Sequence, residues 1–223
     1  MDDKHSRAPK QSRSRESFDR VIEAAIELLD TGGLPALTLA EVSRRSKVSI
    51  GSIYCRVASK EDLLRAVQAR FLEDMDREFS SMINRLRRRG LPLRELVPAL
   101  VREQARFLHR HTALINAFVT RGMEDPVVAA LGRKYHAQSA LDFKLLLLER
   151  HNEFLHADPE HAAATCFTVV YGALARYLGL GGNRETGAGE GDWKKLIEDL
   201  GLMSLAFLAM DLRSIAAPVD AGR

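Results

Sequence analysis

The sequence has only two cysteines, Cys55 and Cys166, which is too few for a disulfide framework or a structural zinc site. No window holds the roughly 18–20 uninterrupted apolar residues that a membrane-spanning helix needs. The most apolar stretch, 196–212, carries three acidic side chains. The N-terminal residues 1–15 are charged and lack the apolar core of a secretion signal. We therefore expect a cytoplasmic protein.

Motifs of common catalytic and metal sites are also lacking. There is no Gly-x-Ser-x-Gly nucleophile motif and no phosphate-binding loop that ends in Gly-Lys-Ser/Thr. His109 and His111 are two residues apart and would point to different faces of a helix. The segment Glu153–His156 is one Glu-x-x-His, whereas a di-iron bundle needs two. We expect no catalytic residue, no metal, no cofactor and no enzymatic activity.

Positive charge is unevenly distributed along the chain. Residues 1–60 hold 11 Lys/Arg against 8 Asp/Glu, whereas residues 61–223 hold 22 of each, so the net charge of +3 lies in the first quarter. Two stretches there, Lys4–Arg15 and Arg44–Lys60, contain no acid. Basic surface placed in this way favours a polyanionic partner.

Apolar residues recur at spacings of three and four along most of the chain, which predicts an all-α fold. Residues 1–13 are polar and are expected to form a flexible basic arm. Gly181–Asp192 is rich in glycine and is expected to be a loop. The expected helices run from about Phe18 to Gly32–Gly33, over Thr38–Ser46 and Ser49–Val57, onward from Ser59, and over Arg94–Arg121, Pro126–Phe154, Asp158–Gly179 and Trp193–Ser214.

The most informative stretch is Thr38–Leu64. Thr38-Leu-Ala-Glu41 has the pattern of a capping box, and Ser49 and Ser59 each have the position of an N-cap. Two short helices with a tight connection between them form a helix-turn-helix. The second of them would expose mainly small and hydroxyl side chains that allow close approach to a DNA duplex.

This stretch resembles the tetracycline-repressor (TetR) family of bacterial regulators. The resemblance covers about residues 15–64 and rests on the pattern Thr38…Val42-Ser43…Val48-Ser49-x-Gly51-Ser52-Ile53-Tyr54-x-x-Val57-x-Ser59-Lys60-x-x-Leu63-Leu64. It implies that Thr38, Tyr54 and Lys60 contact phosphate. The groove-facing positions of the family fall on Ile50, Gly51, Ser52 and Cys55.

Residue chemistry and the resemblance together predict a set of DNA-binding residues. They are Thr38, Arg44, Ser49, Ile50, Gly51, Ser52, Tyr54, Cys55, Arg56 and Lys60. Taken without the resemblance, the same segment is equally compatible with a structural three-helix bundle that has solvated charges. The basic residues of the arm are compatible with minor-groove contact or with an idle tail.

The segment departs from the family pattern at a few positions. Lys47 stands where the family usually has a turn glycine, and a left-handed conformation there would cost a non-glycine residue roughly 1 kcal/mol. Ser43 and Ser46 replace common alanines and Val57 replaces a common aromatic. Arg56 replaces a frequent histidine and gains a permanent charge.

The C-terminal half offers a dimerisation surface and a ligand pocket. The last two helices are apolar on most faces and are expected to pair with a second copy, as in the family, although they could instead fill a monomer core. The dimer candidates are Phe167, Val170, Leu174, Tyr177, Met203, Phe207 and Met210. Several polar residues fall on apolar helix stripes, where they either satisfy one another or meet a ligand. The ligand candidates are Phe71, Gln104, Phe107, His111, Phe118, Tyr135, Gln138 and Asp142.

These observations predict a ligand-responsive homodimeric repressor that binds a palindromic operator and is released by a small apolar effector. Its expected partners are double-stranded DNA, a second copy and a small molecule, with no membrane. The alternatives are a helical adaptor that does not bind DNA and a helical-bundle enzyme. The expected divisions are an arm (1–13), a helix-turn-helix domain (14–62), a ligand-binding and dimerisation domain (63–215) and a tail (216–223).

Overall fold

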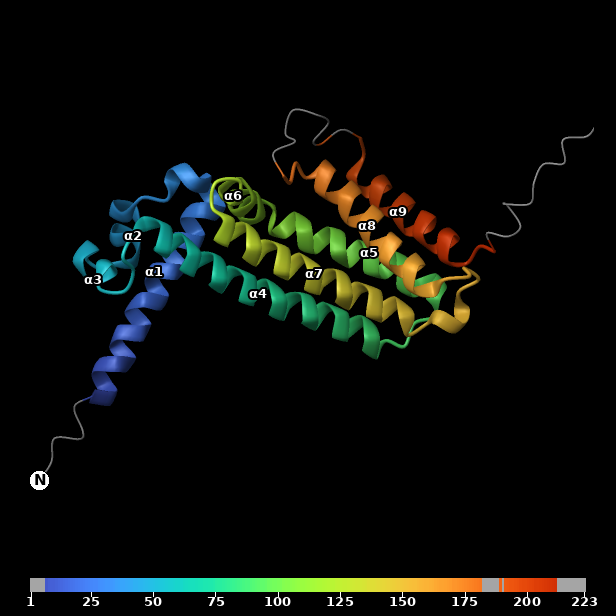
Figure 1. Ribbon diagram of the computed structural model, residues 1–223, viewed down its shortest axis with the longest axis horizontal. Helices are drawn as coiled ribbons and strands as arrows, with labels where there is room; N and C mark the ends of the chain where they lie inside the picture. The colour runs from blue at the N-terminus through green and yellow to red at the C-terminus, as the bar shows by residue number, and fades with distance from the viewer. Residues whose placement is uncertain (1–6, 182–188, 190, 212–223) are drawn as a thin grey trace, which may run out of the picture. The chain divides into compact units, whose positions relative to one another are not determined.

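The computed structural model describes residues 7–181, 189 and 191–211, with side chains from Ser14 onward. Within these residues all regular structure is helical and no strand occurs, which confirms the predicted fold class (Figure 1). None of the described helices is both long and apolar enough to cross a bilayer. The elements are α1 (Arg7–Ala36), α2 (Leu39–Ser46), α3 (Ile50–Tyr54), α4 (Lys60–Arg88), α5 (Leu93–Arg110), α6 (Thr112–Gly122), α7 (Pro126–Leu148), the 3₁₀ turn η1 (His151–Glu153), α8 (Pro159–Tyr177) and α9 (Trp193–Leu208).

The chain forms two compact units. The first contains the chain up to Met75 together with Ala113–Gly132, and the second contains Asp76–Thr112 and the chain from Arg133. Helices α4 and α7 each contribute residues to both units.

Helix α1 begins earlier than the sequence suggests. We expected an arm over residues 1–13, of which 1–6 lie outside the described residues, but the backbone is helical from Arg7. The segment 7–13 is rich in Arg, Ala, Lys and Gln, which are good helix formers. Gly33, with φ 65°, interrupts the helical geometry, so the predicted stop at the glycine pair is confirmed.

The predicted helix-turn-helix is present in the first unit. The Thr38 and Ser49 hydroxyls each accept a backbone N–H at 3.2 Å, from Glu41 and Ser52 respectively, and so cap α2 and α3. Between the two helices Lys47 has a left-handed backbone, with φ 56° and ψ 33°. Helix α3 ends at Tyr54 and not at Val57 as expected. It closes there because the N–H groups of Arg56 and Val57 both bond the Ile53 carbonyl.

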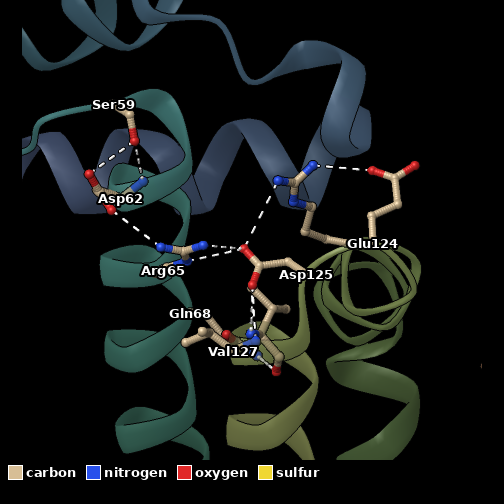
Figure 2. A network of polar contacts seen from close by, with 9 residues as sticks. Ser59, Asp62, Arg65, Gln68, Glu124, Asp125 and Val127 are labelled. Atoms are coloured by element: carbon tan, nitrogen blue, oxygen red, sulfur yellow. Dashed lines mark hydrogen bonds and ion pairs between the residues drawn. The ribbon is translucent and has the colours of Figure 1, made fainter.

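A polar network joins the start of α4 to the α6–α7 corner within the same unit (Figure 2). The Ser59 hydroxyl caps α4 by accepting the Asp62 N–H at 3.1 Å, which confirms the third predicted cap. Arg65 donates to Asp62 at 3.4 Å and to Asp125 at 3.0 Å. The other Asp125 oxygen accepts the Val127 N–H at 3.0 Å at the start of α7.

Asp125 is buried, with 3% of its surface exposed, and its environment favours the carboxylate. Burial alone would raise the pKa of Asp125, but the Arg65 guanidinium and the backbone N–H groups of Val128 and Val127 together bring it below its ordinary value. The ionised Asp125 carboxylate therefore holds the α6–α7 corner against α4. It is stable when buried because Arg65 and the α7 N–H groups compensate its charge.

Two further contacts hold the same corner. The buried Gln68 side chain donates to the Val128 carbonyl at 2.8 Å, and the rings of Phe71 and Phe118 stack with centroids 5.6 Å apart. No pattern in the sequence indicates that residues 113–132 belong with the helix-turn-helix. These contacts give the physical reason for it.

The second unit is built on α5, α8 and α9, which pack on one another (Figure 1). Helices α9 and α5 approach closely at Gly201, where an added Cβ would lie 3.2 Å from Pro98 Cα. A side chain at this position would push α9 away from α5, so the glycine permits the contact.

The predicted single helix over Arg94–Arg121 is wrong, because the chain forms α5 and α6 in its place. Helix α5 ends at Arg110, and the Thr112 hydroxyl donates to the Leu108 and His109 carbonyls at 2.9 and 3.0 Å. A threonine that bonds the preceding turn in this way competes with the continuous backbone ladder.

The last predicted boundaries also shift. Helix α7 ends at Leu148 and is followed by η1, whose Glu153 carboxylate accepts the Leu93 N–H at 2.8 Å. Helix α9 ends at Leu208, and residues 212–214 of its expected end lie outside the described part, as do most of the glycine-rich loop and the tail over 216–223.

The left-handed turn at Lys47 makes a stability prediction. K47G should be more stable than K47A by about 1 kcal/mol, because only glycine adopts this backbone without a Cβ clash. Urea unfolding of both variants, followed by circular dichroism, measures the difference. Equal midpoints, or a more stable alanine variant, would contradict a left-handed residue 47.

The carboxylate at Asp125 makes a second prediction. D125N keeps an oxygen for the α7 amides but loses the charge that pairs with Arg65, so its melting temperature should fall by about 2–4 °C at neutral pH. Because the folded-state pKa of Asp125 is lowered, the wild-type advantage should shrink as the pH falls below about 4. D74N, at an exposed pair with Arg70, is the matched control. A wild-type advantage over D125N that has the same size at all pH values would rule out this origin.

Candidate nucleic-acid interface

The outer face of α3 is exposed, whereas its inner face is anchored in the core. Ile53 is 1% exposed and packs inward, as does Val48 in the preceding turn. On the outer face the large side chains of Ile50 and Tyr54 are 41% and 49% exposed. Gly51 would meet nothing within 4 Å if it carried a Cβ, so the backbone there is open to an approaching partner.

All the predicted DNA-binding residues lie in the first unit, and each is exposed. They are Thr38, Arg44, Ser49, Ile50, Gly51, Ser52, Tyr54, Cys55, Arg56 and Lys60. The structure thus brings together on one unit the residues that the sequence singled out. Their contact with DNA stays a prediction.

One of these cations is already paired. Arg44 bonds the Glu41 carboxylate at 2.9 and 2.5 Å, and Arg45 bonds the same group at 3.2 Å. These hydrogen bonds lower the pKa of Glu41 to about 2, so the carboxylate stays ionised and offsets part of the positive charge of α2. In the predicted capping box Glu41 was expected to reach back to the Thr38 N–H, whereas that N–H bonds the Ala36 carbonyl.

Arg56 is held by two residues of α1 that no sequence pattern connects with it. Its guanidinium donates to the Ser14 hydroxyl and lies 5.7 Å from the centroid of the Phe18 ring. Both partners come from α1, about 40 residues earlier. No local pattern joins positions so far apart, so only the folded chain reveals this arrangement.

The ligand candidates in the second unit fall into two groups. Gln104 is buried, and its Oε1 has no hydrogen-bond partner among the described residues. The buried hydroxyl of Tyr135 is likewise without one, and burial raises its pKa above the ordinary value. In contrast, His111 Nε2 lies 2.8 Å from Glu78 Oε2, a partner that the sequence did not indicate.

Most of the other ligand candidates do not lie where a common pocket in the second unit would require. Gln138 is exposed and donates to Asp142 at 2.9 Å, so it is a surface pair one helical turn apart and does not lie on a buried stripe. Phe107 is buried and forms an edge contact with Phe79 at 5.3 Å. Phe71 and Phe118 belong to the first unit, where they stack on each other.

The dimer candidates fall into a buried group and a more exposed group. Phe167, Val170 and Leu174 are 4%, 0% and 0% exposed, because this face of α8 fills the core of the second unit itself. Tyr177 and Phe207 are half-buried, while Met203 and Met210 are 61% and 39% exposed. Two exposed apolar residues that the sequence analysis did not select, Val169 and Leu202, lie on α8 and α9.

The comparison with known families locates the helix-turn-helix. Residues 21–67 match the model of "Bacterial regulatory proteins, tetR family". This range includes α2, α3, the first residues of α4 and most of α1.

Two curated proteins are similar to parts of the chain. The A-factor receptor protein of Streptomyces griseus is 30% identical over 108 residues, an alignment that covers 48% of this chain and 35% of the relative. The uncharacterized HTH-type transcriptional regulator TtgW of Pseudomonas putida is 29% identical over 69 residues, with 31% and 52% covered. The alignments thus span about a third and a half of the length of these relatives.

Solved structures resemble almost the whole chain. A TetR-family transcriptional regulator assigned in Mesorhizobium loti superposes with a TM-score of 0.72 at 16% identity, covering 88% of this chain and 97% of that one. The transcriptional regulator FadR of Bacillus subtilis, in complex with stearoyl-CoA, gives a TM-score of 0.61 at 14% identity, covering 85% and 98%.

At such identities the structural likeness establishes the fold, an N-terminal helix-turn-helix followed by a helical C-terminal part. The match over residues 21–67 falls on the same helix-turn-helix whose caps, left-handed turn and exposed outer face are described above. Residues 21–67 are therefore a helix-turn-helix domain of the kind found in the tetR family of bacterial regulatory proteins.

Proposed function

We propose that the chain is a ligand-responsive homodimeric transcriptional repressor that binds a palindromic DNA operator through α3. The observation that carries this proposal is the exposed outer face of α3. It combines two large exposed side chains, Ile50 and Tyr54, with small and hydroxyl residues and with Arg56 and Lys60 beside it. Small residues allow the backbone to approach a major groove, and the cations neutralise phosphates.

The small size of the exposed α3 surface supports a two-fold dimer of the chain. A single helix of five residues reads only a short sequence, and dimers gain specificity by reading two half-sites about 34–36 Å apart. We propose that α8 and α9 supply the dimer contact through Val169, Leu202 and Met203. Their exposure on adjacent helices supports this choice, since large apolar side chains gathered at a surface mark interaction sites.

The effector is proposed to bind in the second unit near Gln104 and Tyr135. A buried polar atom without a partner is destabilising by about 1–3 kcal/mol, and a ligand that supplies the missing hydrogen bond recovers that free energy. The stearoyl-CoA complex of the similar FadR structure supports a ligand with a large apolar part. Such a ligand would favour a state whose two recognition helices no longer match the half-site spacing.

The alternatives are an adaptor without DNA binding and a helical-bundle enzyme. Both predict that α3 has no affinity for a duplex. The steep salt dependence of DNA binding separates them from the proposed regulator.

Binding to duplex DNA tests the proposal directly. Fluorescence anisotropy with a labelled duplex should show binding at low salt, with log K falling linearly as log[salt] rises. K60A should reduce the magnitude of that slope by about 0.9, the value for one lost phosphate contact. K134A, an exposed lysine of the second unit, should leave it unchanged. If the wild-type chain binds no duplex at low salt, the regulator assignment fails.

The oligomeric state tests the dimer surface. The wild-type chain should have the mass of a dimer at micromolar concentration in sedimentation equilibrium. M203E should raise the dimer dissociation constant by at least about 100-fold, because it would bury an unpaired carboxylate. L141E, at an exposed leucine of α7, is the matched control and should remain dimeric. A dimeric M203E, or a monomeric wild-type chain, would contradict this interface.

A further inference from the structure

A second feature of the first unit lies beside α3. A hollow of about 220 Å³ opens between α1 and the turn-and-α3 segment. Its lining residues are Ser14, Ser17, Phe18 and Val21 from α1, and Val48, Ser52, Cys55 and Arg56 from the segment that carries α3.

The charge in the lining of the hollow is positive only. Arg56 is the only charged residue among those that line the hollow, and three of the others are serines. The nearby α1 acid Asp19 does not line it and lies 4.0 Å from Arg70. A guanidinium surrounded by hydroxyl groups, with no carboxylate in the lining, is suited to an oxyanion.

The guanidinium is also held in place before any ligand arrives. It is bonded to the Ser14 hydroxyl and lies over the Phe18 ring, which restricts the long side chain. The Ser17 hydroxyl donates to the Ser14 carbonyl at 2.9 Å, a bond within one turn of the α1 wall. A pre-positioned cation loses less conformational freedom on binding than a free one.

The floor of the hollow is apolar. Val21 and Val48 are 1% and 9% exposed, and Phe18 forms one side. Carbon-rich surface next to a cationic rim matches a sugar-phosphate unit, whose sugar is largely hydrocarbon on one face and whose phosphate is anionic. A simple inorganic anion would use the rim only.

We propose that this hollow binds a phosphate group, with Arg56 and Ser14 as its ligands. The phosphate is that of a sugar-phosphate unit, either in the backbone of a duplex that α3 contacts or in a free phosphorylated compound. In the first case α1 is part of the DNA-contacting surface, and that case rests on the proposed function. In both cases Ser14 and Phe18 of α1 have a binding role that the helix-turn-helix pattern does not contain.

The first arm of the test uses a labelled duplex and four variants, each checked for an unchanged circular dichroism spectrum. R56A should weaken binding at least about tenfold and reduce the salt slope by about 0.9. R56K should keep the slope and lose part of the affinity, because an ammonium lacks the planar fork. S14A should lose affinity with no change in slope. R70A, an arginine of the same unit outside the hollow, is the control.

The second arm titrates inorganic phosphate and deoxyribose 5-phosphate, followed by amide chemical shifts of Ser17 and Ser52. Shifts at low-millimolar ligand in the wild-type chain, absent in R56A, support the hollow as a phosphate site. If they occur while R56A binds duplex like R70A, the source is a free phosphorylated compound.

Failure of the hollow proposal and failure of the proposed function give different results. If the wild-type chain binds duplex but R56A matches R70A, and neither phosphate probe shifts Ser17 or Ser52, the hollow proposal is overturned and the proposed function stands. If the wild-type chain binds no duplex, the proposed function fails, and the second arm alone then decides whether the hollow binds phosphate.

Discussion

The packing of two very short helices on α1 is the constraint on which the candidate interface depends. Helices of eight and five residues are too short to be stable by themselves in water. They persist because Val42 and Ile53 are buried in the core of the first unit, 0% and 1% exposed, together with α1 residues such as Ala25. Since these inward side chains fix the rotation of α3, they also determine which of its residues face outward. The exposed set follows from the buried one.

The connection between α2 and α3 shows how closely this packing is specified. Lys47 adopts a left-handed backbone that costs a non-glycine residue about 1–2 kcal/mol. The buried Ser46 hydroxyl accepts the Val48 N–H at 3.3 Å on the other side of the turn. The burial of Ser46, Val48 and Ile53 offsets the strain at Lys47, so the turn keeps its shape without glycine. Lys47 itself is exposed, which leaves its charge available to solvent or to a polyanion.

Both units contain buried polar groups, and not all of them are satisfied. In the first unit the buried Asp125 carboxylate is supplied with donors and joins α4 to the α6–α7 corner. Two buried atoms of the same unit, Gln68 Oε1 and Arg121 Nε, have no hydrogen-bond partner among the described residues, and neither do Gln104 Oε1 and the Tyr135 hydroxyl of the second unit. Satisfied groups stabilise a single arrangement, whereas a buried group without a partner leaves free energy to be gained from a hydrogen bond.

Features that depend on residues three or four positions apart could be predicted from the sequence. The caps at Thr38, Ser49 and Ser59 and the stop at Gly33 all belong to this class. The hydrogen bonds and backbone preferences that produce them are local, so the pattern of residues is sufficient. The exposed face of α3 followed for the same reason, because its apolar and polar residues separate at helical spacing.

Features that depend on which surfaces meet could not be predicted in this way. Helices α8 and α9 are apolar on most faces, so their sequence does not say that Phe167, Val170 and Leu174 point into the core while Met203 points outward. Gln138 lies on a stripe with leucines and is nevertheless at the surface. The pairing of Arg56 with Ser14 and Phe18, and of Arg65 with Asp125, joins positions about 40 and 60 residues apart. Local periodicity places a side chain on a helix, but the neighbouring helix decides whether that side is core, surface or site.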